Sequence, residues 1–355
     1  MSSRPIGVVA CGHPETARAA EAILADGGNA FDAVIAAHFA ACVAEPVLAS
    51  LAGGGFLLAH TVDGRDLVYD FFAHTPRRPR ASDDIDFYPI SADFGTARQE
   101  FHIGLGAVAT PGSVRGMFDI QRELCTLPMT RLVEPATEAA RRGITLNALQ
   151  AYIFDVIKPI YLSTPAAAEI FASPDSPDSL VGEHEVLRQG QLADVLEALA
   201  RDGDALFYEG EIAGLIADLC KRGGGHVTIE DLANYRVLKR APLHLKYRGT
   251  HILTNPAPSS GGVLIAFALK LLESFSPRQY GFGTVAMVQL LADVMAATNL
   301  ARSDTHLDEQ IHPHAVRLLD ETIIGNYLAR VRRGAHCSRG TTHISVADAA
   351  GNVAS

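Results

Sequence analysis

Tryptophan is absent from this 355-residue chain. No uninterrupted apolar stretch reaches the roughly 18 residues that a membrane-spanning helix needs. The first residues, Met1–Ala10, contain no long apolar core of the kind that secretory signal peptides carry. We therefore predict neither a transmembrane helix nor a signal peptide, and we expect a cytoplasmic protein without a membrane partner.

Cysteine is also scarce. The five cysteines lie far apart, in an odd number and without CxxC spacing, which favours reduced thiols over disulfides or a metal site. The closely spaced pair in His312-Pro313-His314 has a proline between its members and is more typical of an exposed loop than of metal ligands. The formal net charge of −10 argues against nucleic acid as a partner. We expect no metal site.

Hydrophobic residues make up 48% of the chain, which is ample for a buried core. The segment Ala30–Ala44 is apolar all round and predicts a core helix. Alternating patterns predict a hairpin of strands Phe56–Thr61 and Leu67–Phe72. Residues 75–102 are polar and proline-containing, as in a long surface loop, and residues 145–240 predict a largely helical lobe. This mixture of strands and helices predicts the α+β class.

Two glycine-rich stretches invite a functional interpretation. Gly53-Gly54-Gly55 lacks the Lys-Ser/Thr of a phosphate-binding P-loop, so close backbone packing beside a pocket is favoured. The stretch Ser259-Ser260-Gly261-Gly262 fits either an oxyanion loop or a helix N-terminus capped by serine. Without a Gly-x-Ser-x-Gly elbow, a serine hydrolase is disfavoured. The helices predicted next, over 263–272 and 285–302, are expected to cover the sheet.

The end of the chain carries the most specific chemistry. Thr342, Ile344 and Val346 alternate with His343, Ser345 and Ala347, which predicts a strand beginning directly after Gly340-Thr341. A threonine hydroxyl can attack the carbonyl of the residue before it, and hydrolysis of the ester then frees an N-terminal threonine that carries both nucleophile and base. Glycine before it leaves the attack unhindered. A plain strand start, with threonines placed for β-propensity, explains the same residues.

The surrounding motifs resemble those of the gamma-glutamyltranspeptidases, which are N-terminal-nucleophile hydrolases. The matching stretches follow the same order along the chain and cover nearly all of it: Gly28-Asn29-Ala30-Phe31-Asp32-Ala33, Gly53-Gly54-Gly55-Phe56, Thr110-Pro111-Gly112, Pro256-Ala257-Pro258-Ser259-Ser260-Gly261-Gly262 and Thr341 to Asn352. The resemblance implies the αββα sandwich, here C-terminally incomplete. It divides the chain into a large-subunit-like region, 1–340, whose helical lobe spans about 145–240, and the start of a small-subunit-like region, 341–355.

The resemblance also implies roles for residues. The precursor is cut between Gly340 and Thr341, and Thr341 becomes the catalytic nucleophile with its own α-amine as the base. Thr342 lends its hydroxyl to Thr341, and Ser259 and Ser260 lie near the active site. The reaction implied is cleavage of gamma-glutamyl amides such as glutathione, with transfer of the acyl group to water or an amine and without a cofactor. The partner implied is a substrate, either a small amide or a short peptide. Assembly into a homo-oligomer is compatible with the same interpretation.

One position departs from the family pattern. In the family an arginine at the end of the second hairpin strand holds the α-carboxylate of the gamma-glutamyl group. Here Phe72 stands at that position, and an aromatic ring cannot make the paired, charge-assisted contact. Arg77, Arg78 or Arg80 in the next loop could reach the substrate instead. Otherwise the protein is an acylase for a non-gamma-glutamyl amide, as in the cephalosporin-acylase-like members of the superfamily.

The chain also stops early relative to the family, whose small subunit continues well beyond this point and supplies the oxyanion donors. The C-terminal small subunit is therefore expected as a missing partner. Residues 1–355 alone are expected to be inactive and poorly soluble. A third alternative follows, a fragment or pseudoenzyme that binds or assembles without catalysis.

Overall fold

The computed structural model describes residues 6–95, 98–307, 317–328, 331 and 342–355. The chain divides into two compact units. The first unit comprises Met1–Arg65, Tyr69–Leu238 and Thr342–Ser355, and the second comprises Asp66–Val68 and Lys239–Thr341. Most of the predicted helical lobe thus belongs to the first unit, and the second unit was not predicted from the sequence.

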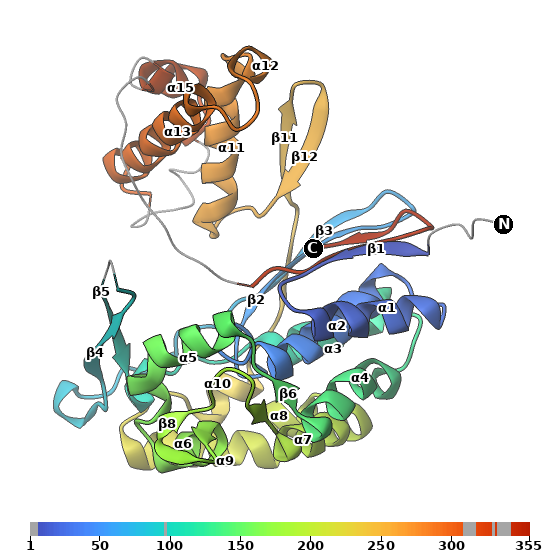
Figure 1. Ribbon diagram of the computed structural model, residues 1–355, viewed down its shortest axis with the longest axis vertical. Coiled ribbons are helices and arrows are strands. Elements are labelled where there is room, and N and C mark those ends of the chain that lie inside the picture. Colours follow the sequence, from blue (N-terminus) through green and yellow to red (C-terminus); the bar gives the residue numbers. More distant parts are fainter. Residues whose placement is uncertain (1–5, 96–97, 308–316, 329–330, 332–341) are drawn as a thin grey trace. The chain divides into compact units, whose positions relative to one another are not determined.

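The main sheet combines strands from both ends of the sequence (Figure 1). Its order is β1-β13-β14-β2-β3-β10. The pairs are antiparallel where the first four strands meet, with Ala10 opposite Ser345, and Ala354 opposite both Val346 and Ala59. The strands are β1 (Gly7–Ala10), β13 (Ser345–Asp348), β14 (Val353–Ala354), β2 (Gly55–His60), β3 (Asp66–Phe71) and β10 (Leu238–Arg240). The predicted hairpin is confirmed. The predicted C-terminal strand is also present, but it begins at Ser345, three residues later than expected.

Helices cover one face of this sheet (Figure 1). They are α1 (Pro14–Ala25), α2 (Ala30–Ala44) and α3 (Ser113–Leu124). Helix α2 begins with a capping box in which Asn29 and Asp32 exchange side-chain and backbone hydrogen bonds. All of its residues except His38 are classed as buried, as the all-round apolar pattern predicts. This helix is the centre of the first unit.

The remainder of the first unit is mostly helical. Thr228 and Asp231 form a capping box at the start of α10. The helices are α4 (Met129–Arg142), α5 (Ala148–Tyr161), α6 (Pro165–Phe171), α7 (Gly190–Asp202), α8 (Ala205–Tyr208), α9 (Glu211–Gly223) and α10 (Ile229–Ala233). Short strands pair between them: β6 (Ile144–Thr145) with β9 (Val186–Leu187), and β7 (Ala172–Ser173) with β8 (Ser176–Leu180).

The predicted surface loop at 75–102 was wrong in part. Strands β4 (Tyr88–Asp93) and β5 (Arg98–Ile103) form an antiparallel hairpin. Ala92 is fully buried against Val156 and Ile157 of α5, so one face of the hairpin is apolar although its outer face is charged. Single turns of 3₁₀-helix flank it, η1 (Ser82–Asp84) and η2 (Leu105–Ala107).

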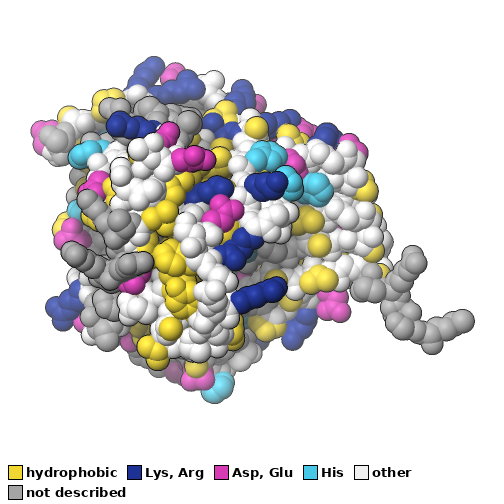
Figure 2. Space-filling model, turned by 90° about the horizontal axis from the view of Figure 1, so that it is seen from above, with side chains coloured by type: hydrophobic (Ala, Val, Ile, Leu, Met, Phe, Trp, Pro, Cys, Tyr) yellow, Lys and Arg dark blue, Asp and Glu magenta, His cyan; other side chains and the backbone are white. Residues whose placement is uncertain are grey.

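The second unit has a core of its own. Phe267 and Leu271 of α11 pack in one buried cluster with Leu290 and Val294 of α13, so the expectation that these helices cover the main sheet was wrong. Its elements are β11 (Leu243–Tyr247), β12 (Thr250–Thr254), α11 (Ser260–Glu273), α12 (Pro277–Tyr280), α13 (Val285–Asp304) and α15 (Glu321–Leu328). Figure 2 shows hydrophobic side chains at the molecular surface among charged ones.

Within the described ranges, no helix combines the length and apolarity that a bilayer span requires. The same residues contain no group of three or more His, Cys, Asp or Glu placed to hold a metal ion.

Candidate active site

Several strand ends meet at one end of the main sheet. Strand β1 ends at Ala10 opposite Ser345, where β13 begins. Ser355, just after β14, exchanges both backbone hydrogen bonds with Leu58 of β2 at 2.9 and 3.0 Å. Since β2 and β3 form a hairpin, Phe72 follows β3 at this same end. Thr342 and Phe72 are therefore about three strand spacings apart, roughly 14 Å between backbones.

Thr342 is held from the helix side of the sheet. Its hydroxyl donates a hydrogen bond of 3.2 Å to Oε2 of Glu45, the residue that follows α2. The other carboxylate oxygen, Oε1, accepts a bond of 3.1 Å from the hydroxyl of Thr16 in α1. The side chain of Glu45 is buried, with 8% of its surface exposed. The hydroxyl of Thr342 thus donates its hydrogen bond to Glu45.

The other end of β13 is held by Asp348. One oxygen of its carboxylate accepts from the backbone N–H of Ala30, at the start of α2, and from the side-chain amide of Asn352, at 3.0 and 2.7 Å. The other oxygen accepts from the backbone N–H groups of Ala350 and Asn352. Burial alone would raise the pKa of Asp348, but these hydrogen bonds outweigh it and hold the pKa below its ordinary value. The negative carboxylate also interacts favourably with the positive end of the α2 dipole, at the helix N-terminus.

Phe72 lies at the sheet end as an exposed aromatic side chain. Of its surface 55% is exposed, and its ring stacks on Phe56 with centroids 5.5 Å apart and planes 22° from parallel. Its backbone is fixed: the carbonyl accepts a 2.8 Å hydrogen bond from the Tyr235 hydroxyl, and the N–H donates to Asp70. Burial raises the pKa of Tyr235, which keeps that hydroxyl protonated and donating.

The glycine motifs pack the backbone around Phe72. A Cβ on Gly54 would lie 2.5 Å from the amide nitrogen of Ala73, closer than any side chain tolerates. A Cβ on Gly112 would overlap with the carbonyl oxygen of Phe71. The carbonyl of Gly53 accepts from the N–H groups of Gly112 and Ser113 at 2.8 and 3.0 Å. Close backbone packing, as predicted for Gly53–Gly55, is therefore confirmed.

The arginines proposed to replace the family's anchor have other contacts. Arg78 pairs with Glu230 of α10 at 3.2 Å. Arg80 donates to the carbonyls of Cys220, Lys221 and Gly225 around the end of α9 and to Asp84. These contacts hold both guanidinium groups on the helical region.

Arg77 differs from its neighbours. Its backbone N–H donates to Asp231 at 3.0 Å. Among the described residues its guanidinium has no ion pair within 4 Å, although its charge helps to lower the pKa of Asp231 after the hydrogen bonds to that carboxylate.

Ser259 and Ser260 lie at the start of α11 in the second unit. Ser259 is the N-cap residue, yet its hydroxyl makes no capping hydrogen bond. A Cβ on Gly262 would overlap with the carbonyl oxygen of Asn255, so that glycine of the motif serves packing. Gly340 and Thr341, the predicted cleavage pair, lie outside the described residues.

Two groups at the sheet end were not singled out from the sequence. Glu45 is one, and its position before Pro46 at the end of an apolar helix was the available signal. The other is His343, whose Nε2 lies 2.9 Å from the hydroxyl of Ser345 and 3.1 Å from that of Ser355. This contact ties the start of β13 to the end of β14.

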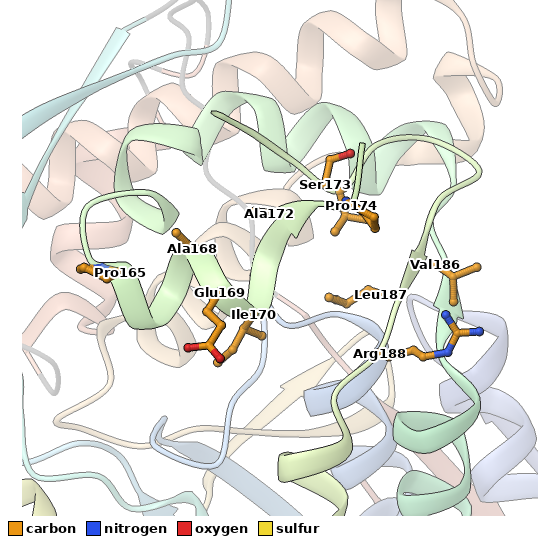
Figure 3. Close-up of a pocket in the computed structure, with 11 residues that line it drawn as sticks. Pro165, Ala168, Glu169, Ile170, Ala172, Ser173, Pro174, Val186, Leu187 and Arg188 are labelled. Atoms are coloured by element: carbon orange, nitrogen blue, oxygen red, sulfur yellow. The ribbon is translucent and has the colours of Figure 1, made fainter. Parts of the chain in front are cut away.

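A separate pocket of about 570 Å³ lies in the helical region (Figure 3). Its floor includes the buried side chains of Val181 and Leu187. The Ser173 hydroxyl donates to Glu185 at 2.7 Å and is thereby satisfied. None of the residues predicted as site residues lines this pocket.

Comparison with known proteins identifies relatives over nearly the whole chain. The acylase ACY 1 proenzyme of Pseudomonas sp. strain V22 is 32% identical over 98% of this chain, and the chain spans 64% of that protein. The glutathione hydrolase proenzyme of Escherichia coli is 34% identical over 79% of this chain and 47% of its own length. The chain thus spans about half to two thirds of these curated relatives.

Solved structures of gamma-glutamyltranspeptidases have the same fold as this chain. Helicobacter pylori gamma-glutamyltranspeptidase superposes with a TM-score of 0.80 at 25% identity, over 95% of each chain. The Pseudomonas nitroreducens gamma-glutamyltranspeptidase gives a TM-score of 0.76 at 26% identity. The predicted α+β class and N-terminal-nucleophile hydrolase fold are confirmed by these neighbours. The gamma-glutamyltranspeptidase family model matches residues 16–355, and the chain belongs to this family.

Proposed function

We propose that this protein is a gamma-glutamyltransferase-like amidohydrolase that cuts itself between Gly340 and Thr341 and then uses Thr341 as its nucleophile. The observation that carries the proposal is the fixed position of Thr342, the residue directly after the predicted nucleophile. It is bound to Glu45 at the sheet end where Phe72 also lies. The names of two relatives, both called proenzymes, support the processing step.

The self-cleavage conserves atoms and electrons. The Thr341 hydroxyl adds to the carbonyl carbon of Gly340, the C–N bond breaks, and the hydroxyl proton ends on the freed α-amine. Water then hydrolyses the ester, releasing the carboxylate of Gly340 and restoring the Thr341 hydroxyl. In turnover the same hydroxyl attacks the substrate amide, the α-amine takes and returns the proton, and the acyl group passes to water or an amine.

The division of the chain follows from this proposal. Residues 1–340 form the large-subunit-like region and 341–355 begin the small-subunit-like region. The oxyanion donors are then expected from the small-subunit-like region, with Ser259 and Ser260 of the large-subunit-like region nearby. The cytoplasmic location stays a prediction.

The test uses the protein expressed from its full reading frame. N-terminal sequencing of the mature protein should find a chain that begins at Thr341, and Thr341→Ala should give one uncut chain without amidase activity. A different N-terminus would refute the nucleophile assignment. An uncut wild-type protein would favour the alternative of a pseudoenzyme that only binds or assembles.

A second candidate, an acylase for a non-gamma-glutamyl amide, is favoured by Phe72. Its exposed ring and the stacked Phe56 offer an apolar surface where a carboxylate anchor would stand. A charge-assisted hydrogen bond contributes about 1.5–3 kcal/mol, or roughly ten- to a hundredfold in kcat/KM. Phe72→Arg should raise kcat/KM for a gamma-glutamyl anilide by that factor and lower it for an anilide with an unsubstituted aliphatic acyl group.

The matched control adds the same charge elsewhere. Phe282, a fully exposed phenylalanine of the second unit, should leave both rates unchanged when replaced by arginine. Efficient wild-type turnover of the gamma-glutamyl anilide that is lost in Arg77→Ala would instead assign the carboxylate to Arg77 and contradict the acylase candidate.

A further inference from the structure

We propose that Glu45 is a positioning residue for the self-cleavage at Gly340–Thr341. The inference rests on the proposed function, because it concerns how that bond is presented. Oε2 of Glu45 accepts a hydrogen bond from the hydroxyl of Thr342, with 3.2 Å between the two oxygens. Thr342 directly follows the proposed nucleophile. A group that holds Thr342 in place also restrains the peptide bond that joins Thr342 to Thr341.

Glu45 is buried, and its hydrogen-bond partners among the described residues are the hydroxyls of Thr16 and Thr342. One carboxylate therefore joins α1 to the residue that follows the proposed nucleophile.

The carboxylate of Glu45 is held on two sides. Thr16, itself fully buried, donates to Oε1. On the other side a Cβ on Gly12 would lie 2.6 Å from Oε2 and 3.6 Å from the Thr342 hydroxyl oxygen, so a larger residue at position 12 would displace the carboxylate. Glycine at position 12 thus leaves room for Oε2 to meet Thr342.

The same helix holds both ends of the strand. Helix α2 has 15 residues and is about 22 Å long at 1.5 Å per residue. The path from Thr342 to Asp348 spans about 20 Å at 3.3–3.4 Å per residue. Asp348 binds the first N–H of α2 and Thr342 binds the residue after its end, so the strand lies extended along the helix. Release of Glu45 frees the end that carries the scissile bond.

The experiment follows cleavage in time with protein synthesised in a cell-free system from the full reading frame. Glu45→Met keeps the length of the side chain and removes both acceptor oxygens, so the hydrogen bond to Thr342 cannot form. We expect cleavage about a hundredfold slower, the loss that follows a displacement of about 1 Å from the reactive geometry. The variant should still melt cooperatively, which separates lost positioning from lost folding. Glu169→Met, exposed on α6, is the matched control and should cleave at the wild-type rate.

Two further variants separate positioning from folding. Thr342→Ser retains the hydroxyl and should cleave faster than Thr342→Val. The double variant Glu45→Met/Thr342→Val should be no slower than the slower single variant, because both single variants remove the same hydrogen bond. Wild-type-like cleavage by Glu45→Met, or equal rates for Thr342→Ser and Thr342→Val, would overturn the inference alone. An uncut wild-type protein would overturn the proposed function and this inference together.

Discussion

The Asp348 carboxylate should be essential for holding β13 on α2, and Asp348→Asn tests this with almost no change in volume. The carboxylate accepts four hydrogen bonds at 2.7–3.0 Å. In the variant one oxygen becomes an amide that faces two donors, the backbone N–H of Ala30 and the side chain of Asn352. Those two bonds cannot form.

The expected loss follows from these bonds. A hydrogen bond to a charged group contributes about 1.5–3 kcal/mol. Because Asp348 is partly exposed, the lower end applies, and two lost bonds destabilise the first unit by about 3 kcal/mol. At about 2–4 °C per kcal/mol for a unit of this size, Tm should fall by about 6–12 °C. Differential scanning calorimetry measures the shift, and Asp178→Asn, at an exposed position of β8, is the control.

The pH dependence gives an independent check. The pKa of Asp348 is depressed in the folded protein, so its contribution is complete above the unfolded pKa of about 3.9 and is lost as pH falls through the folded value. The Tm difference between wild type and Asp348→Asn should therefore be constant from pH 7 to about 5 and shrink in more acidic solution. A variant as stable as the Asp178→Asn control at pH 7 would refute the reasoning.

Two other substitutions test the packing that supports the site. Gly116→Ala in α3 places a Cβ against the ring of Phe71. The cost of overpacking exceeds the gain in helix propensity, so the variant should be less stable by about 1–2 kcal/mol in urea unfolding. Gly214→Ala in α9, where a Cβ would meet no other atom within 4 Å, should raise the free energy of unfolding by up to about 1 kcal/mol. If both substitutions changed the stability in the same direction, packing against Phe71 would not explain the glycine at position 116. Asp204→Asn removes the carboxylate 2.6 Å from Arg115, a side chain only 13% exposed, and leaves it the longer contact of 3.6 Å to the exposed Glu209. By the same measurement it should cost about 3 kcal/mol, the lower end of the range for breaking a buried pair. A loss under about 1 kcal/mol would show that Arg115 finds another partner or water.

The sequence was informative wherever a local pattern determines the structure. The apolar run Ala30–Ala44 could only be a buried helix, and the alternation in Phe56–Thr61 and Leu67–Phe72 could only be strands. The hairpin within 75–102 was missed because its outward face carries most of its charges, and those made the whole stretch resemble a loop. Tertiary packing of Ala92 on α5 determines the strand there.

The site itself depends on contacts that no local pattern encodes. Glu45 and Thr342 are far apart in the sequence, and their pairing depends on β13 entering the sheet beside β1. The motif Gly53-Gly54-Gly55 was understood as backbone packing, but its contact with Thr110-Pro111-Gly112 required the structure. The second unit was missed because helices that pack on each other and helices that cover a sheet have similar apolar faces.

Position 72 can change its chemistry because the fold does not depend on its side chain. The backbone of Phe72 is held by the side chains of Tyr235 and Asp70 and enclosed by Gly54. On the Phe72 side, all of these contacts use main-chain atoms. The ring contacts Phe56 and is otherwise mostly exposed. An arginine and a phenylalanine can therefore occupy the same backbone with little difference in folding energy. Substrate choice and fold stability are then determined by different atoms of one residue, which explains how a single scaffold can present either a charged or an aromatic group to an acyl chain.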